Sequence, residues 1–450
     1  MPADYVYRIE QPHRAGQLAR VCSAISEAEG LIGDIETVKI GRHRSVRQIN
    51  IEVADEQQAE SISDRLGEVE GVRVLDVYDR AISAHHGGKI RMEANAPVKT
   101  LQDMRDVYTP GVARVCEAIA EDESLARRYT MIGTTIAICT NGTRVLGLGD
   151  IGPTASMPVM EGKALFYRRL AGISAVPLLI SAREPDEFVE TVSRLSCGFG
   201  AIHLEDISAP ECFEIEERLI SGLDIPVMHD DVHGTAVAAL AAVIVGCHQT
   251  DISLDEATLG QIGLGAAGLG IAGLAVQAGT SRVLAADPDE QAQERARERG
   301  IEIASMEEVM ENADVVCATT GKPGLIEPSS VREGQVILAL SNPEPEITPE
   351  DALEAGASFA ADGSMVNNVL GFPGIFRGAL ACGASRISES MKLAAAGAIA
   401  NFTEASELVP DPLDAEVHAR VAQAVANAAE AEGLAREAFA PEHLDAAPGA

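Results

Sequence analysis

Hydrophobic and polar positions over the first 80 residues alternate in short runs, with two helix-like segments between them. Four runs alternate as strands, at 5–9, 35–40, 49–53 and 72–77. Two further segments, 16–30 and 58–69, carry apolar side chains on one helical stripe. The predicted order is strand, helix, strand, strand, helix, strand. That order is typical of a ferredoxin-like βαββαβ unit.

From residue 100 onward, strand-like and helical runs alternate, which favours an α/β fold with parallel sheets. The clearest runs are the strands 131–138, 175–180, 200–203 and 282–286 and the helices 185–195, 236–245 and 415–431. We predict five parts: an N-terminal unit (1–82), a linker (83–99), a substrate and metal domain (100–250), a Rossmann-type doubly wound domain (251–385) and C-terminal helices packed back on the core (386–450).

The charge balance excludes two classes of partner. The 450 residues include 69 acidic and 35 basic side chains, for a formal net charge of −34. A nucleic-acid binder needs a basic face for phosphates, and an anionic membrane surface also attracts basic segments. Only six of the basic residues are lysine. An acid excess with scarce lysine resembles proteins adapted to high salt, which is a hypothesis about the host.

Cysteine usage and the N-terminus favour a cytoplasmic protein. The eight cysteines are scattered singly with no CxxC pair, as in a reduced compartment. The first residues have neither a basic nor an apolar signal region. The apolar stretch 262–279 has the length of a membrane span, but its six glycines favour a nucleotide-binding loop.

That stretch contains a dinucleotide-binding pattern. A strand, 259–262, leads into Gly263, Gly265 and Gly268 in GxGxxG spacing, and the helical run 269–277 follows. The first glycine permits the turn, the second lets the backbone approach a pyrophosphate, and the third allows close packing. The helix N-terminus offers free N–H groups to the phosphates. An unliganded doubly wound domain is the alternative.

The next strand, 282–286, ends at Asp287, whose carboxylate can accept hydrogen bonds from a ribose hydroxyl. No Arg or Lys follows directly to receive a 2′-phosphate, so the sequence favours NAD over NADP. Residues 314–321, which include Thr320, are predicted to form a later strand and the loop beside the nicotinamide.

Carboxylates gather at the end of a predicted strand and before a predicted helix. Glu205 and Asp206 follow the strand 200–203, and Asp230 and Asp231 precede the apolar helix 236–245. Three hard oxygen donors from Glu205, Asp206 and Asp231 suit Mg²⁺ or Mn²⁺, and the absence of cysteine argues against zinc. Taken singly, each acid could equally be a helix cap. Their coincidence with a dinucleotide domain favours a catalytic site.

Other polar residues stand in unusual places. Tyr108 lies at a predicted turn, Arg144 precedes a glycine-rich loop at 147–152, and Lys163 is predicted to open an apolar helix. Tyr108 could be an ordinary packing residue and Lys163 a surface lysine.

These residues carry a family resemblance. The segments Tyr-Thr-Pro-Gly-Val-Ala (108–113), Met-Pro-Val-Met-Glu-Gly-Lys (157–163), His-Leu-Glu-Asp-Ile (203–207) and His-Asp-Asp-Val-His-Gly-Thr-Ala (229–236) are similar to the malic enzymes. Ser-Asn-Pro-Glu-Pro-Glu (341–346) and Asn-Asn-Val-Leu-Gly-Phe-Pro-Gly (367–374) resemble the short prokaryotic form. The likeness runs from about residue 88 to 437 in the family's order.

The resemblance implies oxidative decarboxylation of L-malate to pyruvate and CO₂ with reduction of NAD or NADP. It implies that Lys163, coupled to Asp230, takes the hydroxyl proton, its pKa lowered by burial and metal charge. It implies that the metal stabilises the enolate and that Tyr108 protonates it. Arg144, Asn342 and Asn367 would bind malate, and Thr235 would lie near the dinucleotide.

The N-terminal unit resembles the ACT domain, a small regulatory module, in its element order and in His-Arg-Ala-Gly (13–16) at the first strand–helix turn. The unit could bind a small effector, or it could have a purely structural, dimerising role. We expect the protein to form a homodimer or higher homo-oligomer. Two other functions compete: a metal-independent hydroxy-acid or amino-acid dehydrogenase, and a non-enzymatic effector sensor.

Overall fold

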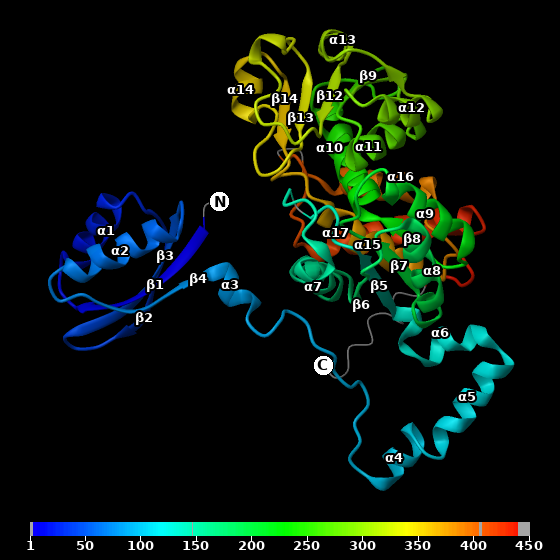
Figure 1. Ribbon diagram of the computed structural model, residues 1–450, viewed down its shortest axis with the longest axis horizontal. Helices are drawn as coiled ribbons and strands as arrows, with labels where there is room; N and C mark the ends of the chain where they lie inside the picture. The colour runs from blue at the N-terminus through cyan, green and yellow to red at the C-terminus, as the bar shows by residue number, and fades with distance from the viewer. Residues whose placement is uncertain (1–2, 146, 405–406, 440–450) are drawn as a thin grey trace. The chain divides into compact units, whose positions relative to one another are not determined.

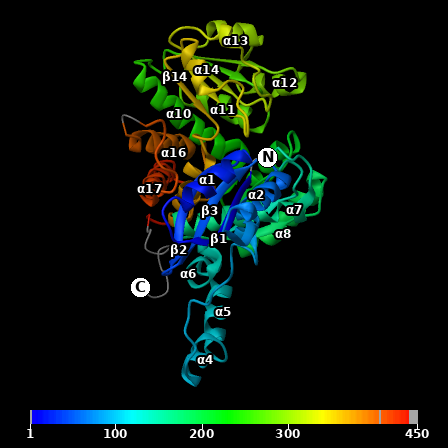
Figure 2. The same ribbon diagram turned by 90° about the vertical axis from the view of Figure 1, so that its left-hand side faces the viewer.

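The computed structural model describes residues 3–145, 147–404 and 407–439, and the last residues of the expected C-terminal segment lie outside them. The chain forms two compact units, residues 1–91 and residues 92–450. Figures 1 and 2 show the elements in two orthogonal views.

The first unit has the element order that the sequence predicts: β1 (Ala3–Pro12), α1 (Gln17–Glu27), β2 (Leu31–Ile40), β3 (Arg44–Val53), α2 (Glu56–Glu68) and β4 (Arg73–Asp79). The sheet order is β2-β3-β1-β4, with every neighbouring pair antiparallel. The alternation in β1 places Tyr7 and Ile9, both fully buried, in one core with α1 and α2. The arrangement is ferredoxin-like.

The predicted linker begins with a short helix. Residues 80–85 form α3 (Arg80–His85), because the Asp79 carboxylate accepts a hydrogen bond from the Ile82 N–H and caps the first turn. No helix or strand follows within the described residues until α4 (Leu101–Val107). The helix therefore includes the first three residues, 83–85, of the segment that the sequence predicts as a linker.

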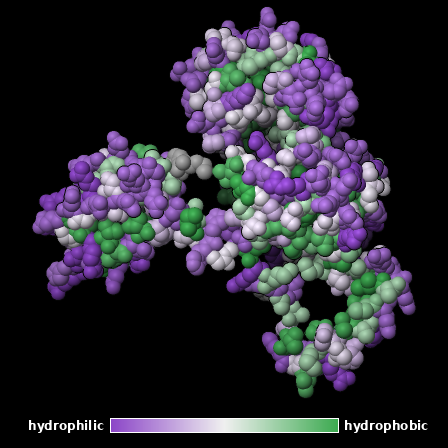
Figure 3. Space-filling view, viewed as in Figure 1, coloured by the Kyte–Doolittle hydropathy of each residue, from purple (hydrophilic) through white to green (hydrophobic). Residues whose placement is uncertain are grey.

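The second unit opens with an exposed helical hairpin, α4 and α5 (Gly111–Glu121), followed by α6 (Ala126–Tyr129). None of the residues of α4 or α5 is buried. The hairpin exposes Leu101, Met104, Val107 and Val115, and Figure 3 shows hydrophobic surface over these helices. It therefore presents an apolar surface that its own unit does not cover.

A four-stranded parallel sheet forms the first layer of the second unit. Its order is β6-β5-β7-β8, from β5 (Thr135–Thr140), β6 (Ser174–Leu179), β7 (Ala201–Leu204) and β8 (Val227–His229). The helices of this region are α7 (Gly152–Ala171), α8 (Pro185–Leu195) and α9 (Glu211–Gly222). The strand predicted to begin at residue 131 begins at residue 135. Residues 131–134 form a 3₁₀ turn instead, started by Thr130, whose hydroxyl accepts from the Ile132 N–H.

The six-stranded sheet has the order β11-β10-β9-β12-β13-β14, all parallel. Its strands are β9 (Thr258–Ile262), β10 (Arg282–Ala286), β11 (Glu302–Ile303), β12 (Val315–Ala318), β13 (Val336–Ala339) and β14 (Phe359–Asp362). Helices α11 (Ala266–Gln277), α12 (Glu290–Glu298), α13 (Met306–Asn312) and α14 (Pro349–Glu354) connect them. Counted along the chain, this is the order 3-2-1-4-5-6 of a Rossmann fold. The doubly wound nucleotide fold is confirmed.

Helices link the two sheets. The turn η4 (Asp230–Gly234) continues into α10 (Thr235–Gln249), and α15 (Phe372–Ala381), α16 (Glu389–Phe402) and α17 (Ala415–Ala431) pack on one another and on α7 or α10. At Gly378 of α15, a Cβ would lie 2.4 Å from the Ala422 carbonyl oxygen of α17, so glycine permits this close packing.

One helical stretch in the described part of the chain, Asp230–Gln249, is long and apolar enough to cross a membrane by length and composition. Because 72% of its apolar window is buried inside the fold, the stretch has the character of a core helix.

Candidate active site

A cluster of carboxylates forms where β7 and β8 end side by side. The two strands are parallel neighbours, with His203 opposite Met228 and Leu204 opposite His229, so the residues that follow each strand meet at one edge of the sheet. One oxygen each from Glu205, Asp206 and Asp231 lies within 4.8 Å of the others. The structure therefore brings together the three acids that the sequence proposed as metal ligands.

Asp206 reaches this cluster through a backbone conformation that non-glycine residues rarely adopt. Its φ is 54°, in the left-handed region, and its backbone N–H donates to Asp231 Oδ2 at 3.0 Å. Strain of this kind is concentrated at functional sites, where the surrounding contacts hold it in place.

Lys163 joins the cluster from the middle of α7. Its sequence context predicts that Lys163 opens a helix, but α7 begins at Gly152, and Lys163 lies on the buried face of α7 with 8% of its surface exposed. Its Nζ is 2.5 Å from Asp230 Oδ2 and 3.1 Å from Glu205 Oε1, and lies over the Phe372 ring. The expected coupling of Lys163 to Asp230 is present as a direct ion pair.

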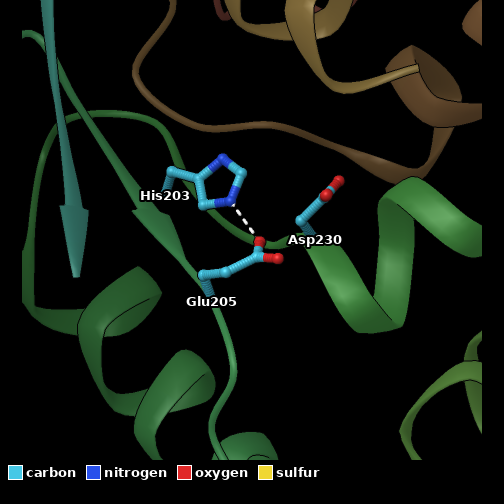
Figure 4. Close-up of side chains that lie close together, drawn as sticks. All are labelled: His203, Glu205 and Asp230. Carbon is cyan, nitrogen blue, oxygen red and sulfur yellow. Dashed lines mark hydrogen bonds and ion pairs between the residues drawn. The ribbon is translucent and has the colours of Figure 1, made fainter. Parts of the chain in front are cut away.

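Two further side chains, to which sequence reasoning gave no role, support the cluster. His203 Nε2 lies 2.6 Å from Glu205 Oε2, and the Tyr167 hydroxyl lies 2.7 Å from His203 Nδ1 (Figure 4 shows His203, Glu205 and Asp230). A local signal existed for both. Tyr167 is four residues after Lys163 on the same helix face, and His203 is two residues before Glu205, a spacing that turns side chains of an extended chain to the same side.

Burial and charge displace the pKa values of this cluster. Burial, together with the neighbouring acids, raises the pKa of Glu205 to about 8 and that of Asp206 to about 9. Burial also raises the pKa of Asp230 to about 6, against the opposing effect of Lys163, and lowers the pKa of His203 to about 4. The cluster therefore contains more carboxyl groups than the positive charge of Lys163 can neutralise.

The pKa of Lys163 differs from the expectation of a lowered value. Burial does lower it, but the negative charges of Asp230, Glu205 and Asp231 outweigh burial and hold the pKa above its usual range. The expected decrease would therefore need a cation on these carboxylates.

The residues fit a divalent cation. Within the described residues, Asp206 Oδ2 and Asp230 Oδ1 are buried without a hydrogen-bond partner. Unsatisfied buried carboxylate oxygens are costly unless a proton or a metal meets them. Three oxygen donors from Glu205, Asp206 and Asp231 are the type that Mg²⁺ and Mn²⁺ prefer.

Two of the proposed substrate residues lie next to the cluster. The Arg144 backbone N–H donates to the Asp206 carbonyl oxygen at 3.2 Å, and its side chain is exposed. Asn367 caps η6 (Asn368–Leu370), which packs on η4, and its Oδ1 accepts from the Val369 N–H. The Asn367 amide nitrogen therefore keeps its donor capacity.

The other two candidates are positioned by other elements. Asn342 follows β13 at the edge of the Rossmann sheet, with its side chain donating to the Gly363 carbonyl oxygen at 3.1 Å. Tyr108 ends α4 on the exposed hairpin, with 68% of its surface exposed. Figure 1 shows α4, which Tyr108 caps at its C-terminal end, extending away from β7 and β8, where the carboxylate cluster lies.

The glycine-rich turn has the geometry of a dinucleotide site. Gly263 has φ +90°, and a Cβ on Gly268 would lie 1.9 Å from the Gly263 carbonyl oxygen. A Cβ on Gly265 would meet nothing within 4 Å, which leaves its backbone open to a ligand. Asp287 closes the turn, because its carboxylate accepts from the Leu264 N–H at 2.6 Å.

A buried acid absent from the sequence prediction orders the opposite side of this site. Glu346 is fully buried and accepts hydrogen bonds from the N–H and hydroxyl of Thr320 and from Ser341. It thereby ties the loops after β12 and β13 together. The only local signal for it was a glutamate in the proline-containing segment 341–346.

The two sites are joined by a close helix contact. A Cβ on Gly270 of α11 would lie 2.2 Å from the Val232 carbonyl oxygen in η4, so only glycine allows this approach. Thr235 begins α10 directly after η4. The nucleotide helix therefore packs against the turn that carries Asp230 and Asp231.

A Rossmann fold whose nucleotide helix packs against the turn of a buried lysine–carboxylate cluster defines a class of protein, the dinucleotide-dependent oxidoreductases. The family model of the malic enzyme N-terminal domain matches residues 87–184 and 180–220, and that of the malic enzyme NAD binding domain matches residues 285–430. The NAD binding domain model of D-isomer specific 2-hydroxyacid dehydrogenases matches residues 244–322, within the nucleotide region alone.

Individual relatives agree. The chain is 51% identical over 423 residues to NAD-dependent malic enzyme 1 of Bacillus subtilis (strain 168), covering 94% of this chain and 96% of that one. It is 40% identical to the NAD-dependent malic enzyme of Geobacillus stearothermophilus, covering 93% and 92%. The crystal structure of malic enzyme from Pyrococcus horikoshii Ot3 matches with a TM-score of 0.75 at 38% identity, covering 80% and 90%. The chain belongs to the malic enzyme family.

Proposed function

We propose that this protein oxidises L-malate and decarboxylates it to pyruvate and CO₂, reduces NAD, and binds Mg²⁺ or Mn²⁺ through Glu205, Asp206 and Asp231. The observation that carries the proposal is the contact of Lys163 with both Asp230 and Glu205, in a cluster that packs against the nucleotide helix. A metal-independent dehydrogenase would have no use for a cluster of acids in which Asp206 and Asp230 each bury an oxygen without a hydrogen-bond partner.

The residues of the chain divide the chemistry between them. As hydride leaves C2 of malate for the nicotinamide, Lys163 takes the hydroxyl proton and shares it with Asp230, 2.5 Å away. Arg144 pairs with a substrate carboxylate, and Asn367 donates its amide N–H. The C4 carboxylate then departs as CO₂, and its bonding electrons form the enolate. A bound cation supplies Lewis-acid stabilisation of that enolate.

Tyr108 is proposed to return a proton to C3, from a second copy of the chain. The supporting observation is the hairpin itself, which carries Tyr108 and exposes apolar side chains that a homo-oligomer would bury. Tyr108→Phe should slow pyruvate formation more than oxaloacetate formation.

Complementation tests the location of Tyr108. Mixing Tyr108→Phe protein with Lys163→Met protein should restore part of the pyruvate formation that each has lost, because some sites in mixed oligomers have both intact residues. No restoration in oligomers shown by mass measurement to be mixed would contradict the shared site.

The choice of NAD over NADP rests on Asp287, whose carboxylate stands at the end of β10 where a ribose hydroxyl would lie. The relatives named NAD-dependent support the same choice.

The eight cysteines are all free, and five are buried, as in the reduced cytoplasmic compartment that we propose for the protein.

We also propose that the ferredoxin-like unit is an ACT-type module that binds a small effector. A cavity of about 400 Å³ lies on its sheet, lined by Asp34, Glu36, Gln48, Asn50 and Arg80 among others. Both charge signs and two amides are suited to a polar zwitterion such as an amino acid. Equilibrium dialysis with the twenty amino acids tests this role, and no retention of any would favour a purely structural role.

Lys163→Met tests the catalytic proposal. The variant should lose malate oxidation by roughly 10²-fold to 10⁴-fold, because it lacks the base, while NADH fluorescence titration still shows binding. The matched control is Lys39→Met, which changes an exposed lysine in the first unit. Malate turnover by Lys163→Met at the rate of the control would refute the assignment.

A further inference from the structure

A buried ionic chain lies behind the turn that carries Asp230 and Asp231. Glu216 of α9 accepts a hydrogen bond from His233 in η4, with Oε2 and Nε2 2.9 Å apart. Lys392 of α16 lies on the other side of the imidazole, its Nζ 3.1 Å from His233 Nδ1. Glu216 and Lys392 are only 6% and 4% exposed. Three elements distant in the sequence thus meet at one imidazole.

The chemistry of the three groups fixes the direction of each hydrogen bond. A lysine ammonium can only donate, so Lys392 donates to His233 Nδ1 and to Glu389 Oε1, the latter at 2.7 Å. The proton of a neutral imidazole then lies on Nε2 and is donated to Glu216. Glu216 is ionised, because the hydrogen bond from His233 and the nearby positive charge overcome the opposing effect of burial and hold its pKa at about 2.

The second oxygen of Glu216 connects this chain to the active site. Glu216 Oε1 accepts the backbone N–H of His229 at 2.7 Å, and His229 directly precedes Asp230. The turn is therefore held at both ends, by its backbone at His229 and by its side chain at His233. The opposite charges of Glu216 and Lys392 stabilise this arrangement, because burying either charge without the other would be strongly unfavourable.

We propose that Glu216, His233 and Lys392 are positioning residues that fix the turn 229–233, so that Asp230 meets Lys163 and Asp231 meets the cation. The inference rests on the proposed metal site. It gives the C-terminal helix α16 a part in the reaction, since Lys392 is the only one of the six lysines besides Lys163 that is buried. Partners behind the ligands of a metal commonly change its affinity by 10-fold to 100-fold.

Mn²⁺ binding to the protein without substrate tests this inference, with free Mn²⁺ counted by electron paramagnetic resonance. Lys392→Met and Glu216→Gln should each weaken binding by roughly 10-fold to 100-fold, while NADH fluorescence titration stays unchanged. Lys392→Arg should recover part of the affinity. The double variant, Glu216→Gln with Lys392→Met, should lose less Mn²⁺ affinity than the two single variants lose together, because no buried charge is left unpaired in it. Lys39→Met is the control for loss of a lysine.

The outcomes separate this inference from the proposed function. Wild-type protein that binds no Mn²⁺ would contradict the metal proposal itself. Wild-type affinity and wild-type malate kcat in folded Lys392→Met would overturn the positioning role, even if its thermal midpoint were lower. If Lys392→Met does not fold, Glu216→Gln and His233→Gln give the same comparison, and wild-type Mn²⁺ affinity in both would equally overturn it.

Discussion

Metal binding should release protons, and the number of protons follows from the pKa values of the ligands. Without metal, the pKa of Glu205 is about 8 and that of Asp206 about 9, because both carboxyls are buried among other acids. At neutral pH Asp206 is therefore mostly protonated, and Glu205, which is paired with Lys163, is partly protonated. A bound cation requires their ionised forms, so each Mn²⁺ should displace between one and roughly two protons.

The same reasoning gives the pH dependence. For each proton released, the affinity should rise about tenfold per pH unit, so that Kd falls by roughly 10-fold to 100-fold from about pH 6 to pH 7. Above about pH 9, where both acids are ionised without metal, the affinity should stop rising.

Titration calorimetry in buffers with different ionisation enthalpies measures this release, because the observed heat changes in proportion to the protons taken up by the buffer. Glu205→Gln should bind more weakly and release about one proton fewer. Binding with no proton release, and with a Kd that does not change between pH 6 and pH 8, would refute the reasoning about this buried cluster.

Three further predictions follow from the nucleotide site and the surface charge. Asp287→Asn should lower kcat/KM with NAD by roughly 10-fold or more and reduce the preference for NAD over NADP, since a charged acceptor for the ribose is lost. An unchanged ratio of kcat/KM with NAD to kcat/KM with NADP in steady-state assays would contradict this role of Asp287. Gly268→Ala should lower the thermal midpoint because its Cβ would clash with the Gly263 carbonyl oxygen, whereas Gly265→Ala should keep the midpoint and weaken NADH binding in fluorescence titration. With a net charge of −34, the thermal midpoint should rise between low salt and about 1 M KCl, and a fold equally stable in low salt would refute the high-salt hypothesis.

Elements with strong periodicity and clear ends could be predicted from the sequence. The helix 185–195 begins at a proline, which is favourable in a first turn, and buries Phe188 and Val192 four residues apart. The helix 415–431 buries Val417, Val421 and Val425 with the same spacing. In both helices the local pattern and the tertiary packing agree, so the bounds are confirmed to the residue.

Lys163 shows why other elements could not be placed. Helix α7 contains Pro158 and Gly162, the two residue types least favourable inside a helix, so the local pattern indicates a helix start near residue 161. Burial of Met160, Ala164 and Tyr167 against the rest of the unit overrides that preference. The lysine thereby lies in the middle of a buried helix, which the sequence alone did not indicate.

The site was predictable to the extent that its residues follow neighbouring strands. Glu205 and Asp231 were predicted together as oxygen donors for one cation, and the structure gives the reason they meet, because β7 and β8 are parallel and end at the same edge. Glu216, His233 and Lys392 meet only through packing of α9, η4 and α16, and no spacing in the sequence relates them. The exposure of Tyr108 was not predictable either, because apolar residues at helical spacing before it, Leu101, Met104 and Val107, normally indicate a packed face.

The most direct test of the central claim is the reaction of the purified protein with L-malate, NAD and Mn²⁺, followed by NADH absorbance and by assays for pyruvate and CO₂. We expect NADH, pyruvate and CO₂ in equal amounts, with activity abolished by a chelator and restored by added Mn²⁺. Full malate oxidation in the presence of chelator, or oxaloacetate as the final product, would contradict a metal-dependent decarboxylating enzyme.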